Sequence, residues 1–191
     1  MRRRALLAVV GALAAGCATV PPVPDSGTAE LDREPLPEHW TLDGRLALSD
    51  AARSWQASLH WEQRGAHYRI DLVGPLGQGR LAIRGGPDGV SLETERETLH
   101  AEDPDELLAR ATGLRLPVRG LRYWVLGRPA PAAPARPVTD DQGRLRRLQQ
   151  SGWYLTYPNY ITVEGRPMPQ RIRAEREALD LRVLITRWRL T

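Results

Sequence analysis

Residues 68–83, YRIDLVGPLGQGRLAI, place two alternating segments on either side of a turn rich in glycine and proline. In 68–73 and 80–83 apolar and polar side chains alternate, which is the pattern of strands that bury one face. The six residues between these segments include three glycines and one proline, a composition typical of a hairpin loop. The stretch therefore predicts a β-hairpin, and much of the chain repeats its alternation.

Leu76 stands at the tip of this loop, where a side chain has little to pack against. One interpretation is that it folds back onto its own hairpin, since single apolar residues are common at protein surfaces. The other is that it is an apolar probe that enters a nonpolar environment. The loop sequence alone leaves both interpretations open.

The same alternation fills the first half of the chain. Residues 40–49, 55–61 and 68–72 each carry one apolar and one polar face, which indicates one-sided strands. The connections are short and rich in turn formers, as in residues 85–89. Short connections join antiparallel strands, because parallel strands need long crossovers. The first half therefore predicts an antiparallel meander.

The period changes to that of a helix at Asp103. This residue is a suitable N-cap, Pro104 is a suitable first helical residue, and Gly113 can end the helix. A second helix is expected over 118–126, followed by a proline-rich loop over 128–137. Strand patterns resume over 145–148, 153–157, 172–174 and 179–190.

These elements predict a mainly β protein of the α+β class. We expect a curved antiparallel sheet with two short helices lying across its concave side. The space between sheet and helices is either filled by side chains, as protein interiors usually are, or partly hollow and apolar. Residues 39–191 suffice for one domain with a substantial core, so we expect a single domain there.

The N-terminal segment has the features of an export signal. In residues 1–16 three arginines precede an apolar run that is too short to span a bilayer. The run ends in small residues directly before Cys17, the only cysteine of the chain, and resembles the lipobox of bacterial lipoproteins. We expect removal of 1–16 and acylation of Cys17, followed by a proline-rich tether over 17–38. The alternative is an ordinary thiol at Cys17.

Charge and motifs exclude several classes of function. The chain carries 27 basic and 23 acidic residues, net +4, and loss of 1–16 removes three arginines and no acid. The remaining arginines are spread among acids along the sequence, so we expect no nucleic-acid partner. The sequence has no G-x-S-x-G or H-E-x-x-H motif, and its four histidines lack metal-ligand spacing. We therefore expect neither an enzyme nor a metal or cofactor site.

One set of residues, taken together, is more specific than any single motif. It comprises Cys17, Trp40-x-Leu42-x-Gly44-Arg45-Leu46-Ala47, Trp61, Tyr68-Arg69-Ile70-x-Leu72, Gly74-Pro75-Leu76-Gly77, Glu106-Leu107-Leu108, Thr112-Gly113, Leu116-Pro117-Val118, Leu121-Arg122-Tyr123-Trp124-Val125-Leu126-Gly127, Gly152-Trp153 and Trp188. This set resembles the LolB family of outer-membrane lipoprotein receptors. The resemblance covers nearly all of the folded part and is most specific in the hairpin and the second helix.

The resemblance implies an incomplete antiparallel β-barrel with a helical lid over an apolar cavity, related to the periplasmic carrier LolA. It implies a monomeric receptor that is anchored at Cys17 to the periplasmic face of the outer membrane. Such a receptor accepts acylated lipoproteins from LolA and inserts them into outer-membrane lipid without a nucleotide. Leu76 then corresponds to the residue that the family needs for membrane insertion.

For the acyl-binding cavity we predict an apolar lining drawn from the strands and the second helix. Two other functions stay open: a lipid-anchored protein-binding or envelope-assembly factor with a filled sheet, and a periplasmic hydrolase with a dispersed site. The predicted cavity residues are Leu46, Leu59, Trp61, Ile70, Leu72, Leu121 and Trp124.

Overall fold

The computed structural model describes residues 35–77, 79–113, 116–131 and 133–191. The expected signal segment 1–16, Cys17 and the tether up to residue 34 lie outside the described residues. Among the described residues, no helix is both long and apolar enough to cross a membrane.

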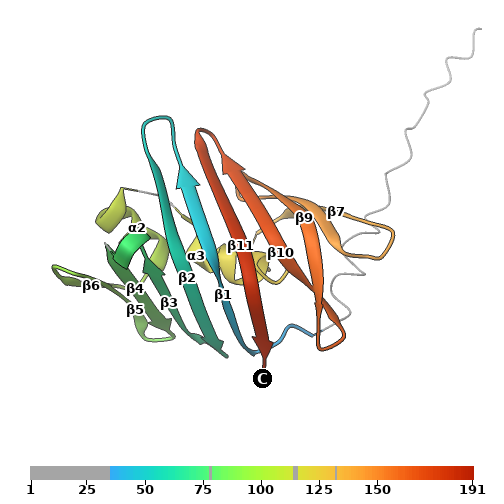
Figure 1. Ribbon diagram of the computed structural model, residues 1–191, viewed down its shortest axis with the longest axis horizontal. Coiled ribbons are helices and arrows are strands. Elements are labelled where there is room, and N and C mark those ends of the chain that lie inside the picture. Colours follow the sequence, from blue (N-terminus) through green and yellow to red (C-terminus); the bar gives the residue numbers. More distant parts are fainter. Residues whose placement is uncertain (1–34, 78, 114–115, 132) are drawn as a thin grey trace, which may run out of the picture.

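Eleven strands form one antiparallel sheet in the order β6-β5-β4-β3-β2-β1-β11-β10-β9-β8-β7 (Figure 1). Every neighbouring pair except β1 and β11 is consecutive in the chain, so nearly all connections are hairpins, as the short turns predicted. β6 and β7 are the two edges of the sheet, which makes the curved barrel incomplete. The strands are β1 His39–Ser49, β2 Ser54–Arg64, β3 His67–Val73, β4 Arg80–Gly86, β5 Gly89–Thr94, β6 Thr98–Ala101, β7 Ala135–Thr139, β8 Leu145–Gln150, β9 Trp153–Val163, β10 Arg166–Arg176 and β11 Leu179–Leu190.

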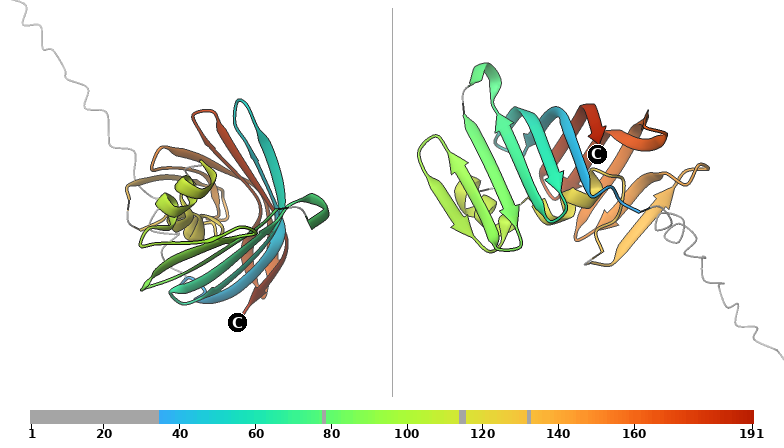
Figure 2. Two further views of the ribbon diagram at one scale, coloured as in Figure 1. Left: turned by 90° about the vertical axis from the view of Figure 1, so that its left-hand side faces the viewer. Right: turned by 90° about the horizontal axis from the view of Figure 1, so that it is seen from below.

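Two helices, α2 (Pro104–Thr112) and α3 (Val118–Trp124), lie on the concave side of the sheet (Figure 2). The alternation of the strands explains this arrangement, because it gives the sheet one apolar face that has to be covered. That face centres on Trp40, which lies 5.3 Å from Trp61 and 5.6 Å from Trp188 between ring centroids. The prediction of a curved sheet with a helical cover is confirmed.

Gly44 permits a close approach of two strands in the sheet. The pairing of β1 with β11 shifts register between Asp43 and Gly44. A Cβ atom on Gly44 would lie 2.3 Å from the carbonyl oxygen of Leu184, a contact that real side chains do not make. Glycine therefore allows the first and the last strand to pair through this irregularity.

The caps of α2 are those that the sequence predicted. The Asp103 carboxylate accepts hydrogen bonds from the backbone amides of Asp105 at 2.7 Å and Glu106 at 3.2 Å. Gly113 ends the helix in the left-handed conformation, with φ 75°. The helix packs on β5 and β6 through its buried face, which includes Leu107 and Leu108.

α3 is shorter than predicted and is held by buried polar groups. It ends at Trp124, and the expected last residues 125–126 form a turn that Gly127 closes with φ 70°. The Trp124 indole donates to the Gln150 side chain at 2.8 Å, and the Tyr157 hydroxyl donates to the Trp124 carbonyl at 3.1 Å. These bonds fix α3 to β8 and β9.

Gln150 also determines the course of the segment that follows α3. Its amide group donates to the carbonyls of Ala130 and Ala133, and its carbonyl accepts from the backbone amide of Ala130. A buried amide satisfied on both sides is a stable contact, whereas an unpaired one would cost free energy. The loop after α3 is therefore pinned to the sheet.

The structure corrects the prediction at two places. The expected loop 128–137 is shorter, because β7 begins at Ala135 and includes Pro137. Proline is tolerated there since β7 is an edge strand. The expected connection 85–89 is also shorter, because β4 extends to Gly86 and β5 starts at Gly89.

Candidate functional site

An apolar pocket of about 490 Å³ lies where β1 and β2, and β3 and β4, reach their turns. Its size falls within the range of ligand-binding pockets. The apolar faces of the strands form one wall of the pocket, and the apolar face of α2 forms the other. The apolar lining consists of Leu46, Leu48, Trp55, Leu72 and Leu81 from the sheet, Leu108 from α2, and Leu116 from the segment after it.

The rim of this pocket is polar. Asp50, Arg53 and Arg80 lie at its edge, and the first two form an ion pair at 3.6 Å. An apolar interior with a charged rim suits a ligand that has a nonpolar chain and a polar end. Trp55 sits at the boundary, since it lines the pocket and is still 37% exposed.

A second pocket, of about 520 Å³, lies against α3 and has a mixed lining. Trp61, Tyr68 and Trp124 contribute aromatic surface, while Asp105 and Arg119 contribute charge. Burial, and after it the negative charge of Asp105, raises the pKa of Tyr68 to about 12. The Tyr68 hydroxyl is uncharged at physiological pH, as it is at its ordinary pKa, and adds a neutral polar group to the lining.

The seven predicted cavity residues are all buried but do not share one space. Leu46 and Leu72 line the first pocket, whereas Trp61 and Trp124 line the second. The other three, Leu59, Ile70 and Leu121, belong to the packed core and line neither pocket. Their role in ligand binding stays a prediction.

The sequence did not single out most of the first pocket. Leu48, Trp55 and Leu81 lie on the same alternating faces as the predicted residues, and Leu108 lies on the apolar face of α2. The three strand residues are marked by their position: they lie near strand ends, where less sheet surrounds them. Alternation alone cannot separate a residue at the mouth from one at the centre.

Leu76 projects from the hairpin tip, 97% exposed. It lies in η1 (Pro75–Gly77) with φ 57° and ψ 22°, a left-handed conformation that costs a non-glycine residue roughly 1–2 kcal/mol. The amide of Gly77 donates to the carbonyl of Gly74 at 3.2 Å, and the amide of Gly74 donates to that of Gly79 at 3.0 Å. Figure 2 shows the loop standing off the convex side of the sheet, away from the helices. The leucine does not fold back onto its hairpin.

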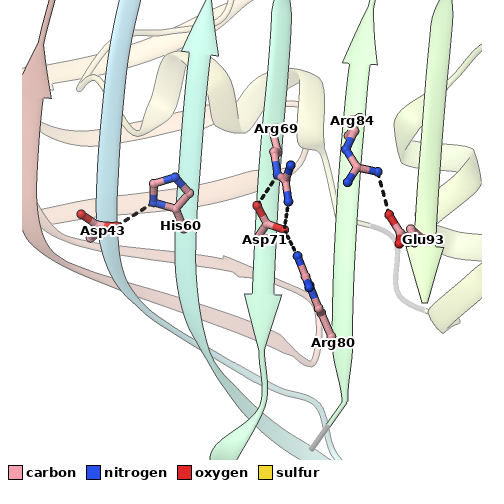
Figure 3. A network of polar contacts seen from close by, with 7 residues as sticks. All are labelled: Asp43, His60, Arg69, Asp71, Arg80, Arg84 and Glu93. Atoms are coloured by element: carbon pink, nitrogen blue, oxygen red, sulfur yellow. Dashed lines mark hydrogen bonds and ion pairs between the residues drawn. The ribbon is translucent and has the colours of Figure 1, made fainter. Parts of the chain in front are cut away.

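The convex face of β1 to β5 carries a series of paired charges (Figure 3). Asp71 accepts hydrogen bonds from Arg69 at 2.6 Å and from Arg80 at 3.2 Å. The hydrogen bond from Arg69 is the main reason that the pKa of Asp71 lies below its usual value. The charges drawn in Figure 3 each have a local partner, so this part of the face is close to neutral. Within the described part of the chain, no group of three or more metal-ligand side chains gathers.

Comparisons with known proteins agree with this architecture. The family model described as "Outer membrane lipoprotein LolB" matches residues 38–188. An outer-membrane lipoprotein LolB of Nitrosococcus oceani is 42% identical over 155 residues, covering 80% of this chain and 77% of that protein. One of Alkalilimnicola ehrlichii is 39% identical over 200 residues, covering 100% and 99%. The crystal structure of a LolA superfamily protein from Nitrosomonas europaea matches with a TM-score of 0.60 at 9% identity, covering 87% and 92%, which shows a shared fold.

Proposed function

Because the chain belongs to the LolB family of outer-membrane lipoproteins, we propose that it accepts acylated lipoproteins from a LolA-type carrier and inserts them into the outer membrane. It is accordingly an outer-membrane lipoprotein, in a family of lipoprotein transport and not a known family of enzymes. The single observation that carries the proposal is the apolar pocket between the sheet and α2.

The physical requirement for such a receptor is shelter for acyl chains in water. Burying each CH₂ group is worth about 0.8 kcal/mol, so a lipoprotein cannot cross an aqueous compartment with its chains exposed. Exchange between two apolar pockets exposes little new surface, and a difference of about 1.4 kcal/mol already biases it tenfold. The transfer therefore needs no nucleotide.

In this proposal the parts of the site have separate roles. Leu46 and Leu72, with Leu108 opposite them, contact acyl chains in the first pocket. The polar rim faces the protein part of the cargo. Use of Leu59, Ile70 and Leu121 requires the helices to move away from the sheet, since these side chains are packed in the core. Leu76 enters the membrane during release.

Displacement of a fluorescent apolar probe tests the proposal. Probe bound to the protein should be released by a triacylated lipopeptide and retained when the same peptide lacks acyl chains. Release by both peptides alike, or by neither, would favour a protein-binding or assembly factor with a filled sheet. The acylated cargo should also pass from a loaded LolA-type carrier to this protein in solution, without membranes present.

We propose, further, that Cys17 carries the anchor. The intact mass of the membrane-bound protein should show loss of residues 1–16 and the addition of acyl chains at the new N-terminus. A mature chain that starts at another residue and holds an unmodified Cys17 would contradict this assignment.

A further inference from the structure

Arginines on the convex face of the sheet occur in two different settings. On β3 and β4 they are paired: Arg69 and Arg80 share Asp71, and Arg84 pairs with Glu93 at 2.7 Å (Figure 3). On β1 and β10, by contrast, Arg45 and Arg171 have no ion-pair partner among the residues that the structure describes. Both of these side chains are exposed.

The strand register brings Arg45 and Arg171 together from distant parts of the sequence. Leu184 on β11 is the cross-strand partner of Arg45 on one side and of Arg171 on the other. Arg182 lies two residues before Leu184 on β11, and it is the cross-strand partner of Arg173 on β10. These four arginines, which we call the arginine cluster, therefore occupy two adjacent rows on three neighbouring strands.

Carboxylates compensate only part of the arginine cluster. Asp180 accepts hydrogen bonds from Arg173 and Arg182, each at 2.8 Å, and Glu175 pairs with Arg173 at 2.7 Å. Both acids are thus engaged by the row nearer the strand turns. The row of Arg45 and Arg171 keeps its full positive charge.

The loop that carries Leu76 borders the arginine cluster. A groove of about 640 Å³ is lined by all four arginines and, from the loop and the strand leading to it, by Pro75 and Val73. The loop stands off the same convex side of the sheet (Figure 2). An exposed leucine held in a left-handed conformation and an unneutralised set of cations therefore share one side of the molecule.

We propose that the arginine cluster binds phosphate headgroups of the target membrane and so orients the convex face with Leu76 toward the acyl layer. Guanidinium groups bind phosphate through paired hydrogen bonds, and basic residues are attracted to anionic lipid surfaces. A single apolar group gives weak attachment, whereas an apolar group together with a basic patch gives a stable one. The inference rests on the proposed function only in that Leu76 enters lipid.

Vesicle flotation tests this proposal without any cargo. The protein is residues 17–191 with Cys17→Ala, which lacks both the basic, apolar signal segment and the acylation site, so that binding reports the folded domain. The vesicles contain phosphatidylcholine alone or phosphatidylcholine mixed with anionic phosphatidylglycerol. We expect Arg45→Gln/Arg171→Gln to weaken binding to the anionic vesicles about thirtyfold, since each basic residue near such a surface contributes roughly a fivefold factor. Added salt should weaken wild-type binding as well.

The matched control is Arg64→Gln/Arg84→Gln, which changes the net charge equally. Arg64 and Arg84 lie on the same side of the sheet but are paired with Glu62 and Glu93. This control should bind within about twofold of wild type, because its arginines are already compensated. Equal losses in both double variants would show a general charge effect and overturn the proposal.

Two further outcomes would also overturn it. Wild-type binding that is equal on both kinds of vesicle would show that the net negative charge of anionic headgroups is not recognised. If Arg45→Gln/Arg171→Gln kept vesicle binding but lost exchange with the LolA-type carrier, the arginine cluster would be a protein-docking surface. Failure of the proposed function appears separately, as absent probe displacement by acylated peptide with vesicle binding intact.

Discussion

Leu76→Glu should accept lipoprotein from the carrier at a normal rate and deliver it to membranes tenfold to about a hundredfold more slowly. The fold should tolerate the change, because Leu76 is 97% exposed and surface substitutions usually alter stability by no more than about 0.5 kcal/mol. A charged side chain is expensive in lipid, however: the cost reaches roughly 2.5–3.5 kcal/mol at the bilayer centre and falls toward the interface, so about two orders of magnitude is the upper limit of the effect. Acceptance and delivery are measured separately, with loaded carrier in solution and then with vesicles.

Two control variants separate the apolar character of Leu76 from its backbone conformation. Leu76→Met keeps an apolar tip and should deliver normally. Leu76→Gly relieves the left-handed φ of 57° and should raise the free energy of unfolding by about 1 kcal/mol, yet deliver poorly because the tip is gone. Normal delivery by Leu76→Glu, or loss of acceptance together with delivery, would show that the tip does not act as an apolar probe.

Local signals in the sequence predicted the elements that local chemistry determines. The hairpin around Leu76 followed from alternation and a loop of glycine and proline, and the limits of α2 followed from Asp103 and Gly113. In both cases a few adjacent residues satisfy the backbone on their own. The conformation of Leu76 could not be predicted, because nothing in its sequence context distinguishes left-handed leucine from leucine folded back.

Features that depend on strand register were beyond the reach of the sequence. Arg45 and Arg171 look like isolated arginines among acids, and only their common partner Leu184 makes them neighbours. The same holds for the pocket. Leu46 and Leu59 have the same alternation and similar burial, but Leu46 lines the mouth while Leu59 lies in the core. Position along the strand, and not periodicity, separates the two: Leu46 lies close to the turn that ends β1, whereas Leu59 lies in the middle of β2.

The pocket gives a further test at Trp55, with a control at the next residue. Trp55 pairs with Leu48 across β1 and β2, and both side chains line the apolar pocket. The pairing of β2 with β3 begins only at Ser58, so the part of β2 that holds Trp55 extends beyond β3. Trp55 is therefore partly exposed at the lip, where an acyl chain would lie across it, and its replacement should disturb little of the fold.

Trp55→Glu should weaken binding of a fluorescent acyl ligand about tenfold, because it removes apolar contact worth about 1.5 kcal/mol and places a charge at the mouth. Gln56→Glu adds the same charge one residue along β2, but Gln56 lies on the convex face and does not line this pocket. Its acyl affinity in solution should equal that of wild type. Chemical denaturation of both variants checks that the fold is intact. Equal affinities in the two variants would mean that acyl chains bind elsewhere, and the mixed pocket around Trp61 and Trp124 would then be the site to test.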